Sequence, residues 1–248
     1  MAVILEAHDL VKTYPLGDHQ VEALRGVSLS VEQGEFVAIM GASGSGKSTM
    51  LHLLGGLDLP TSGEVVIDGV RISTLDEERR TLTRRAKTGF VFQFFNLIPL
   101  LTVAENVALP FLIAGETVAR NRERVDELLA LVGLTDKAEH RPDELSAGEQ
   151  QRIALARALA TSPAILLADE PTGNLDYTTG TEILDLLWDS SDRLGQTIVL
   201  VTHDARAAAY ADRVLVVRDG QVRDEIVLGR RADHEARPLI TRLSELGL

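Results

Sequence analysis

The sequence predicts an α/β fold built on a mainly parallel sheet, and three observations support this. The apolar run Phe36–Met40 has the length of a buried strand and leads directly into the glycine-rich stretch 41–48, which reads Gly-Ala-Ser-Gly-Ser-Gly-Lys-Ser. A second apolar run, 165–168, ends in the carboxylates Asp169 and Glu170. The chain has 248 residues, of which 45% are hydrophobic, enough to build a sizeable core.

The elements before and just after the glycine-rich stretch follow from apolar runs and turn residues. Segments 3–5 and 24–31 are predicted strands, separated by glycine-containing turns. A helix is expected from Lys47 to about Leu54, where two glycines stop it. Residues 63–70 then read as a short strand. We expect an exposed helix over 76–85, because that segment is charged on most faces.

Beyond residue 90 the pattern changes from strands to helices and then returns to the core pattern. The strand 90–93 precedes two segments of helical periodicity, so we expect a helical subdomain at about 94–160 inserted into the α/β core. The predicted helices of this half are 103–112, 120–132, 150–160 and 180–194, and the predicted strands are 165–168, 197–201, 213–217 and 221–227. The last two strands form a hairpin around Asp219-Gly220.

The glycine-rich stretch has the chemistry of a phosphate site. Gly41, Gly44 and Gly46 would let successive backbone N–H groups point at a phosphate, above the positive end of the following helix. Lys47 would reach the β- and γ-phosphates, and the Ser48 hydroxyl would ligate Mg²⁺. We therefore expect ATP or GTP to bind here with Mg²⁺. The candidate nucleotide-binding residues of this segment are Gly41, Ala42, Ser43, Gly44, Ser45, Gly46, Lys47, Ser48 and Thr49.

The two carboxylates after the second apolar run are candidates for catalysis. The C-terminal end of a parallel strand opens on the ligand crevice of an α/β sheet. Asp169 would hold the Mg²⁺ through its water shell, and Glu170 would orient or deprotonate the attacking water. The alternative is a solvated acidic turn, and the phosphate loop favours the catalytic interpretation.

A third segment lies between these two. Residues 145–152 read Leu-Ser-Ala-Gly-Glu-Gln-Gln-Arg, a glycine-bearing turn that opens a helix, and alone it indicates only a helix N-terminus capped by Ser146. Beside the other two motifs it resembles the signature motif of ATP-binding-cassette ATPases, usually Leu-Ser-Gly-Gly-Gln. Ala147 and Glu149 depart from that pattern, whereas Ser146 and Gly148 match it.

Four further positions extend the resemblance over residues 3–228. Gln93 matches the family's Q-loop, which contacts nucleotide and metal, and Asp176 ends a segment, 173–176, that matches its D-loop. His203 matches the switch histidine and should face the same crevice as the two carboxylates, near the γ-phosphate. Tyr14 stands where the family stacks an aromatic ring on adenine.

The resemblance also implies an architecture and a second copy of the chain. The fold would be a P-loop NTPase of the ABC nucleotide-binding type, with an antiparallel β subdomain and an inserted α-helical subdomain. One ATPase domain would span 1–228, followed by a tail, 229–248, that could form one helix. In a head-to-tail homodimer, Ser146 and Gly148 of one copy would cap the γ-phosphate held by Lys47 of the other. Ala147 and Glu149 would lie beside that phosphate, and Asp176 would also belong to the nucleotide site.

The segment after the Q-loop glutamine suggests a further partner. Phe90 and Phe92 are expected in the core by alternation, but adjacent Phe94 and Phe95 cannot both point inward. We expect a groove here for a short helix of a membrane permease on another chain, or else a surface covered by the helical subdomain. The amino-acid sequence of this region resembles that of the subfamily of macrolide-export, lipoprotein-release and cell-division ATPases, which implies a role in export or mechanotransmission.

Composition excludes several classes of protein. A formal net charge of -12 argues against a nucleic-acid partner. The absence of cysteine excludes disulfides and thiolate metal sites. The sequence contains no run of about 18 apolar residues that would predict a membrane span, and the first residues do not resemble a signal peptide. We therefore expect a cytoplasmic protein that is peripheral on the inner face of the membrane through its permease.

Together these features predict an enzyme that hydrolyses ATP to ADP and phosphate to drive a permease. An ATPase of a soluble iron–sulfur assembly scaffold is the alternative, because it would share every ATP motif. A DNA-associated cassette ATPase is disfavoured by the acidic charge. A regulatory ATPase without turnover is disfavoured by the presence of Glu170.

Overall fold

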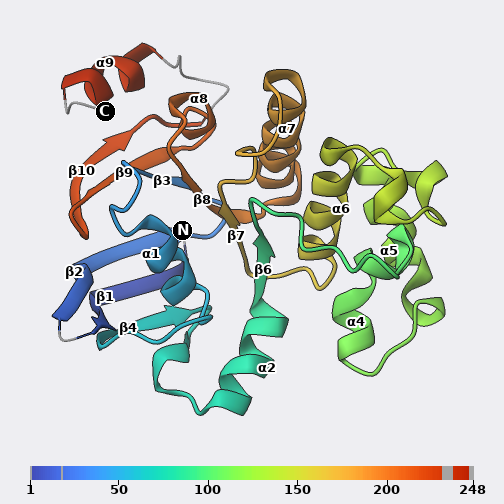
Figure 1. The fold of residues 1–248 in the computed structure, drawn as a ribbon, viewed down its shortest axis with the longest axis horizontal. Coiled ribbons are helices and arrows are strands. Elements are labelled where there is room, and N and C mark those ends of the chain that lie inside the picture. Colours follow the sequence, from blue (N-terminus) through green and yellow to red (C-terminus); the bar gives the residue numbers. More distant parts are fainter. Residues whose placement is uncertain (1, 18, 231–236, 246–248) are drawn as a thin grey trace.

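The computed structural model describes residues 2–17, 19–230 and 237–245, and it confirms an α/β fold with a separate antiparallel sheet (Figure 1). The strands are β1 (Val3–Leu16), β2 (His19–Glu32), β3 (Phe36–Met40), β4 (Ser62–Ile67), β5 (Val70–Arg71), β6 (Thr88–Val91), β7 (Ile165–Asp169), β8 (Thr197–Thr202), β9 (Arg213–Arg218) and β10 (Gln221–Val227). The α-helices are α1 (Lys47–Leu54), α2 (Glu77–Lys87), α3 (Val103–Val107), α4 (Leu109–Ile113), α5 (Arg122–Leu131), α6 (Ala147–Leu159), α7 (Tyr177–Leu194), α8 (Ala205–Ala208) and α9 (Arg237–Glu245).

The strands form two sheets of different kinds. The four-stranded sheet has the order β2-β1-β4-β5 and is antiparallel throughout. The six-stranded sheet has the order β10-β9-β3-β8-β7-β6, in which all neighbours pair in parallel except the edge strand β10. Every residue of β3 and β8 is buried, which explains why the central strands appear as unbroken apolar runs.

Successive residues of β3 belong to two hydrophobic cores, one on each face of the six-stranded sheet. Phe36, Ala38 and Met40 pack in a core with helices α3, α5, α6 and α7. Val37 and Ile39 pack in a second core with β1, β2 and α1. The parallel sheet is therefore covered on both sides, and its C-terminal edge is where functional groups can gather.

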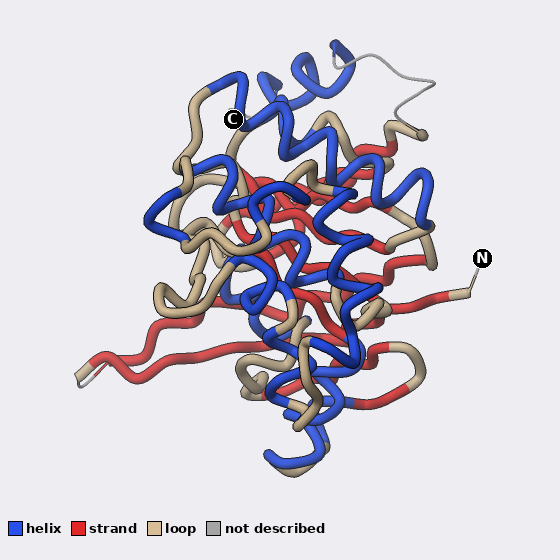
Figure 2. The backbone as a smooth tube through the Cα atoms, turned by 90° about the vertical axis from the view of Figure 1, so that its right-hand side faces the viewer, coloured by secondary structure: helices blue, strands red, loops and turns tan. Residues whose placement is uncertain are grey.

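The helices after β6 lie together, away from the antiparallel sheet. In Figure 1 helices α4, α5 and α6 occupy the side of the molecule opposite β1, β2 and β4. The hairpin of β1 and β2 extends beyond the rest of the chain in Figure 2. No helix in the described part of the chain is long and apolar enough to cross a membrane.

Helix α9, near the C-terminal end of the chain, packs against the first core. Leu239 and Leu243 are buried within that core, and Arg242 bonds Asp224 of β10 at 2.9 Å. Of the predicted tail, 229–248, residues 231–236 and 246–248 lie outside the described residues.

Several predicted element boundaries were wrong. Strands β1 and β2 are much longer than the apolar runs 3–5 and 24–31, because register shifts let the pairing continue through polar residues of an exposed hairpin. The single helix predicted at 103–112 is two short helices, since Pro110 has no N–H to donate to the preceding turn. Helix α6 begins at Ala147, which confirms Ser146 as its cap and shows that the start predicted at 150 was too late.

The expectation that Phe90 and Phe92 lie in the core was met only in part, since Phe90 packs against the second core and Phe92 belongs to neither core. Their alternation does place them on one side of the chain, where the rings stack with centroids 5.5 Å apart. Both rings are only partly buried, because they line a surface groove.

Candidate nucleotide-binding and catalytic site

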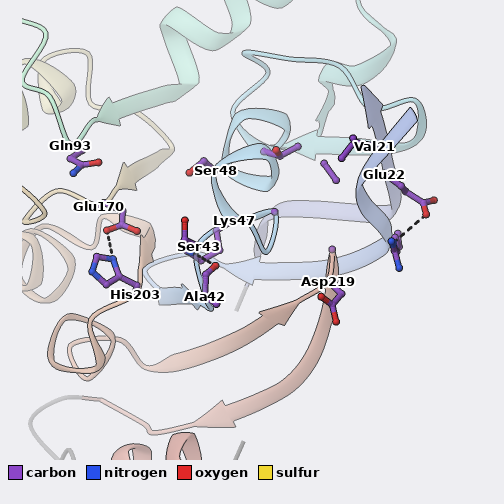
Figure 3. Close-up of a pocket in the computed structure, with 16 residues that line it drawn as sticks. Val21, Glu22, Ala42, Ser43, Lys47, Ser48, Gln93, Glu170, His203 and Asp219 are labelled. Atoms are coloured by element: carbon purple, nitrogen blue, oxygen red, sulfur yellow. Dashed lines mark hydrogen bonds and ion pairs between the residues drawn. The ribbon is translucent and has the colours of Figure 1, made fainter. Parts of the chain in front are cut away.

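A cleft of about 780 Å³ opens at the C-terminal edge of the six-stranded sheet (Figure 3). It is lined by Val21, Glu22, Ala23, Arg25, Ala42, Ser43, Gly44, Gly46, Lys47, Ser48, Thr49, Gln93, Glu170, His203, Asp219 and Gly220. The structure thus brings together most of the predicted phosphate loop, the Q-loop glutamine, the second carboxylate and the histidine. Gly41 and Ser45 belong to the same loop and are buried behind the lining residues.

The phosphate loop is held in shape by close backbone contacts. Gly46 has φ +103°, and a Cβ at this position would lie 2.5 Å from the carbonyl oxygen of Ala23. The Gly220 N–H donates to the Ser45 carbonyl at 3.0 Å, and the Gly220 carbonyl accepts from the Arg25 N–H at 2.9 Å. The loop is therefore fixed between β2 and the turn that joins β9 to β10.

Lys47 places a cation at the start of α1. Its side chain is 6% exposed, and its Nζ donates to the carbonyls of Gly41 and Ala42 at 2.8 and 2.9 Å. No side chain caps the N-terminus of α1, where Gly46 is the N-cap residue. The first amides of the helix and the lysine together form a site for an anion such as a nucleotide phosphate.

Ser48 and Asp169 form an oxygen-donor pair beside the lysine. The Ser48 hydroxyl donates to Asp169 Oδ1 at 3.2 Å, and burial raises the pKa of Asp169. A hydroxyl and one carboxylate fit Mg²⁺, which is usually held by one or two protein oxygens together with water and substrate phosphates. The described residues include no cluster of three or more His, Cys, Asp or Glu side chains that would form an all-protein metal site. The donors present therefore fit Mg²⁺ bound with a nucleotide.

Glu170 and His203 lie in contact with each other at one side of the cleft. His203 Nδ1 lies 2.5 Å from Glu170 Oε2, and in Figure 3 both side chains point into the cleft near Lys47. Glu170 has φ +47°, a left-handed conformation that is uncommon for a residue with a side chain. Its N–H donates to the Val201 carbonyl at 2.9 Å, and its own carbonyl accepts from Gly173 at 3.0 Å. Such local strain, held by surrounding bonds, is typical of functional positions.

Gln93 reaches the cleft from the end of β6. Its Nε2 donates to Asn174 Oδ1 at 3.3 Å, and Asn174 Nδ2 donates back to the Gln93 carbonyl at 3.0 Å. With the amide nitrogen directed to Asn174, the amide oxygen is the atom that a metal would use. Its contact with metal stays a prediction.

Tyr14 is not among the residues that line the cleft. Its hydroxyl donates to Asp58 at 2.8 Å, and Lys12 Nζ lies 4.8 Å from the ring centroid. Burial raises the pKa of Tyr14, and the bond to Asp58 adds to this. Tyr14 pairs with Val21 across the hairpin, and Val21 does line the cleft. Stacking of Tyr14 on adenine stays a prediction.

Sequence reasoning missed the cleft residues of β2 and of the turn before β10. Val21, Glu22, Arg25 and Asp219 belong to no motif. The register of the β1–β2 hairpin and the Asp-Gly turn brings them to the cleft, and only the turn was visible in the sequence.

The signature segment lies outside the cleft, and its polar groups form hydrogen bonds within the segment. Ser146 caps α6, and its hydroxyl and N–H both donate to Glu149 Oε2 at 2.8 Å. The Glu149 N–H donates back to Ser146 Oγ at 3.3 Å, which completes a capping box. These bonds from the backbone and side chain of Ser146 lower the pKa of Glu149. Ala147 and Gly148 are the first residues of the helix, and none of the four lines the cleft.

Asp176 likewise acts as a helix cap. Its Oδ1 accepts from the N–H groups of Thr178 and Thr179 at 3.0 and 3.1 Å, and its Oδ2 accepts from the Thr179 hydroxyl at 2.6 Å. The residue starts α7 and does not line the cleft. Its predicted contact with nucleotide is untested.

A second hollow of about 330 Å³ lies between α2, β6, α4 and α6. The stacked rings of Phe90 and Phe92 line it, with Leu109, Pro110 and Ile113 of α4 along another wall. Its remaining lining residues are Arg84, Arg85, Thr88, Gly89, Asn96, Arg157, Ala158 and Thr161. Phe94 is 69% exposed just beyond. We call this hollow the aromatic groove.

Comparison with known proteins agrees with this geometry. A family model described as ABC transporter matches residues 24–173. The ABC transporter ATP-binding protein MJ0796 of Methanocaldococcus jannaschii is 48% identical over 229 residues, covering 90% of this chain and 96% of that protein. A dimeric structure of MJ0796 in a post-hydrolysis state, bound to ADP and Pi, matches with a TM-score of 0.83 and 46% identity, covering 90% of this chain and 98% of the other.

Two further relatives have names that refer to transport. The lipoprotein-releasing system ATP-binding protein LolD of Bordetella pertussis is 49% identical, over 89% of this chain and 96% of its own length. The macrolide export ATP-binding/permease protein MacB of Brucella abortus is 47% identical, over 89% of this chain but only 34% of its own length. These matches confirm the resemblance drawn from the motifs and favour a transporter ATPase over one that serves an iron–sulfur scaffold. With the cleft, its phosphate loop and its carboxylates in place and a family model matching more than half of the residues, the chain belongs to the ABC transporter family.

Proposed function

We propose that this ATPase of the ABC transporter family binds Mg-ATP in the cleft of one copy and hydrolyses it when the signature segment of a second copy closes over the γ-phosphate. One observation carries the proposal. Lys47, Glu170 and His203 converge in the cleft, whereas Ser146 lies on a helix N-terminus outside it. A site divided in this way is completed by a head-to-tail pair, in which bound ATP joins the two copies. The dimeric state of the MJ0796 relative supports this arrangement.

Within the cleft, the loop amides and Lys47 would bind and orient the phosphates. Ser48, Asp169 and the Gln93 amide oxygen would hold Mg²⁺, which when bound neutralises charge on the β- and γ-phosphates. Glu170 would accept a proton from the attacking water. The oxygen of that water would then form a bond to the γ-phosphorus while the bond between the γ-phosphorus and the leaving ADP oxygen breaks. His203 would fix the Glu170 carboxylate through the 2.5 Å contact and would lie beside the departing phosphate.

We place a membrane partner in the aromatic groove. The phenylalanine rings and the residues of α4 give it apolar walls, and Arg84, Arg85 and Arg157 contribute positive groups. A short apolar helix with acidic residues at its rim would complement that surface. The names of LolD and MacB, which refer to lipoprotein release and to a permease, support a permease on a separate chain as the partner. The chain would then sit at the inner face of the membrane and drive export or mechanotransmission.

The variant Glu170→Gln tests the catalytic part of the proposal. Loss of the proton acceptor should lower the rate of ATP hydrolysis by at least about 100-fold while Mg-ATP still binds. Size-exclusion chromatography should then show a dimer with Mg-ATP and a monomer without it. Hydrolysis at the unaltered rate would contradict the role of Glu170.

The same variant, tagged and recovered from detergent-solubilised membranes with Mg-ATP, tests the partner. Mass spectrometry should identify a permease among the captured proteins. Adding Phe92→Glu, which places a charge in the aromatic groove, should abolish the capture, whereas Ile240→Glu on exposed α9 should not. Capture of soluble scaffold proteins alone would contradict the assignment of a membrane partner.

A further inference from the structure

Gln151 is a polar residue of α6 whose side chain is completely buried. Its Nε2 donates to the carbonyl of Phe92 at 3.1 Å and to the carbonyl of Pro171 at 2.6 Å. These two carbonyls belong to the residues next to Gln93 and Glu170. A single amide therefore holds the two segments that bring the Q-loop glutamine and the candidate general base to the cleft.

Both carbonyls lie where the regular structure has ended. Phe92 follows the last residue of β6, and Pro171 follows the strained residue Glu170. Pro171 has no N–H, so its carbonyl is the backbone group through which this position of the turn can be fixed. An unbonded, buried carbonyl is unfavourable, and the Gln151 amide satisfies two of them at once.

The position of Gln151 on α6 gives these bonds a second consequence. The same helix begins with Ser146 and its capping box, the segment that would meet the nucleotide of the partner copy. Helices are stiff over a few turns, so a displacement of the helix N-terminus is carried to Gln151. Through its hydrogen bonds to Pro171 and Phe92, Gln151 would pass this displacement to the turn that contains Glu170 and to the end of β6.

We infer that Gln151 is a positioning residue that sets Glu170 and Gln93 relative to α6, so that the placement of the signature helix controls hydrolysis in the cleft of its own copy. The inference rests on the proposed role of Glu170 as general base. It adds a residue outside the phosphate motifs to those on which turnover depends. Gln93 and Asn174, bonded to each other in both directions, join the same network.

Gln196 provides a control away from the cleft. Its Nε2 also donates to two carbonyls, those of Pro163 and Thr197, both at 3.1 Å, but these lie at the N-terminal ends of β7 and β8, at the edge of the sheet opposite the cleft. Substituting methionine for either glutamine keeps the side-chain length and frees two carbonyls. The two variants therefore differ in which loops they release.

The experiment measures kcat, the KM for Mg-ATP and the thermal midpoint of the full chain for Gln151→Met and Gln196→Met. Gln151→Met should lower kcat by about ten-fold or more, since misplacing a catalytic group by a fraction of an ångström has effects of this size, with KM within about two-fold. Gln196→Met should keep kcat within about two-fold of the original protein. An unchanged kcat in Gln151→Met, or an equal loss of kcat in Gln196→Met, would overturn the inference.

A second measurement separates this inference from the function on which it rests. In single-turnover experiments in a Glu170→Gln background, Gln151→Met should lower the residual rate by clearly less than it lowers kcat of the original protein, because the part of its effect that acts through Glu170 is then absent. An equal loss of about ten-fold there would show that Gln151 does not act through Glu170 and would overturn the inference. Unaltered turnover in Glu170→Gln alone would overturn the base and the inference together, whereas unaltered kcat in Gln151→Met alone overturns only the inference.

Discussion

The N-termini of α1 and α6 are built in opposite ways, although both are expected to face the same phosphate in a dimer. Helix α1 starts at Gly46 with no capping side chain and has Lys47 at its first position. Helix α6 starts with Ser146 and Glu149 in a reciprocal capping box, which places a carboxylate at its first turn. The first terminus is open to an anion, and the second is already satisfied by its own chain.

This difference separates binding from closure. The lining of the cleft comes from β2, α1, the loops that follow β3, β6, β7 and β8, and the turn before β10, so one chain supplies all of it. In the proposed dimer, the N-terminus of α6 approaches the phosphate from another copy and against the charge of Glu149. Nucleotide binding should therefore be a property of the single chain, and hydrolysis a property of the pair.

The largest expected effect comes from removing the cation of the first terminus. Lys47→Ala should abolish measurable ATP hydrolysis, by about 100-fold or more, and weaken Mg-ATP binding to the single chain, because it removes the charge paired with the phosphates. Fluorescence titration with a labelled ATP analogue measures the binding. Lys137→Ala, outside the cleft, is the control. Normal nucleotide affinity in Lys47→Ala would show that the N-terminus of α1 does not bind the phosphates through this charge.

The second prediction concerns the capped terminus. Ser146→Ala should lower kcat by about ten-fold or more while binding of the ATP analogue to the single chain stays within about two-fold, because the lost hydroxyl acts only after closure. The lost cap should also reduce the free energy of unfolding by about 1 kcal/mol.

Thr102 offers the control for this prediction, because it caps α3 in the same kind of box with Glu105. Thr102→Ala should cost a similar stability of about 1 kcal/mol and leave hydrolysis unchanged. Equal losses of hydrolysis in both variants would mean that Ser146 matters only as a cap.

The third prediction tests how α6 is seated on α7. A Cβ at Gly148 would lie 2.2 Å from Cγ2 of Thr179, and that methyl cannot turn away without breaking the Thr179 bond to Asp176. Gly148→Ala should therefore reduce the free energy of unfolding by about 1–3 kcal/mol, as overpacking usually does. Adding Thr179→Ser removes the methyl and leaves Cβ of residue 179 as the nearest atom, at 3.6 Å.

Urea unfolding of the single and double variants measures this coupling. The double variant should recover most of the lost stability, since a serine side chain keeps the hydroxyl that donates to Asp176. Losses that simply add would show that α6 is not seated against this methyl.

The smallest expected effect is that of the charge in the capping box. Glu149→Gln keeps an oxygen that accepts from Ser146 and removes the negative charge. In a Glu170→Gln background, the Mg-ATP concentration for half-maximal dimer should fall by about two- to five-fold. Light scattering measures the dimer, and an unchanged midpoint would mean that the charge does not oppose closure.

The same residue makes a prediction about pH. The pKa of Glu149 is lowered in the folded chain by its bonds from Ser146, so its charged form adds stability above the pKa of the unfolded chain, about 4.3, and this stability is lost as pH falls through the folded value. The free energy of unfolding of the original protein should therefore exceed that of Glu149→Gln by more at neutral pH than at acid pH. Urea midpoints over a pH series measure the difference, and a constant difference would contradict the assignment.

Contiguous motifs made much of this site predictable. The proximity of Lys47, Ser48 and the carboxylates Asp169 and Glu170 could be predicted from sequence, because each short motif follows or ends a strand and these strand ends meet at one edge of the parallel sheet. Helix α1 also begins and ends where glycine and helix propensity place its limits. Such local rules do not depend on the rest of the fold.

Long-range register was the part that the sequence could not supply. Val21 and Arg25 reach the cleft only because the hairpin pairs with bulges, and Gln151 matters because α6 packs across the ends of β6 and β7. Phe90 and Phe92 alternate as predicted, but whether their shared side is core or groove depends on where α4 packs. Each of these outcomes is decided by tertiary packing, which no local pattern contains.

The turn between β9 and β10 gives the phosphate loop a property that its glycines alone would not. A chain rich in glycine has high conformational entropy, and ordering it on a ligand would weaken binding. Here Gly220 bonds the loop at Ser45 and the hairpin at Arg25, so protein contacts determine the loop's shape. The free energy gained from the phosphates is then not offset by ordering the loop, and the loop is preorganised for its ligand.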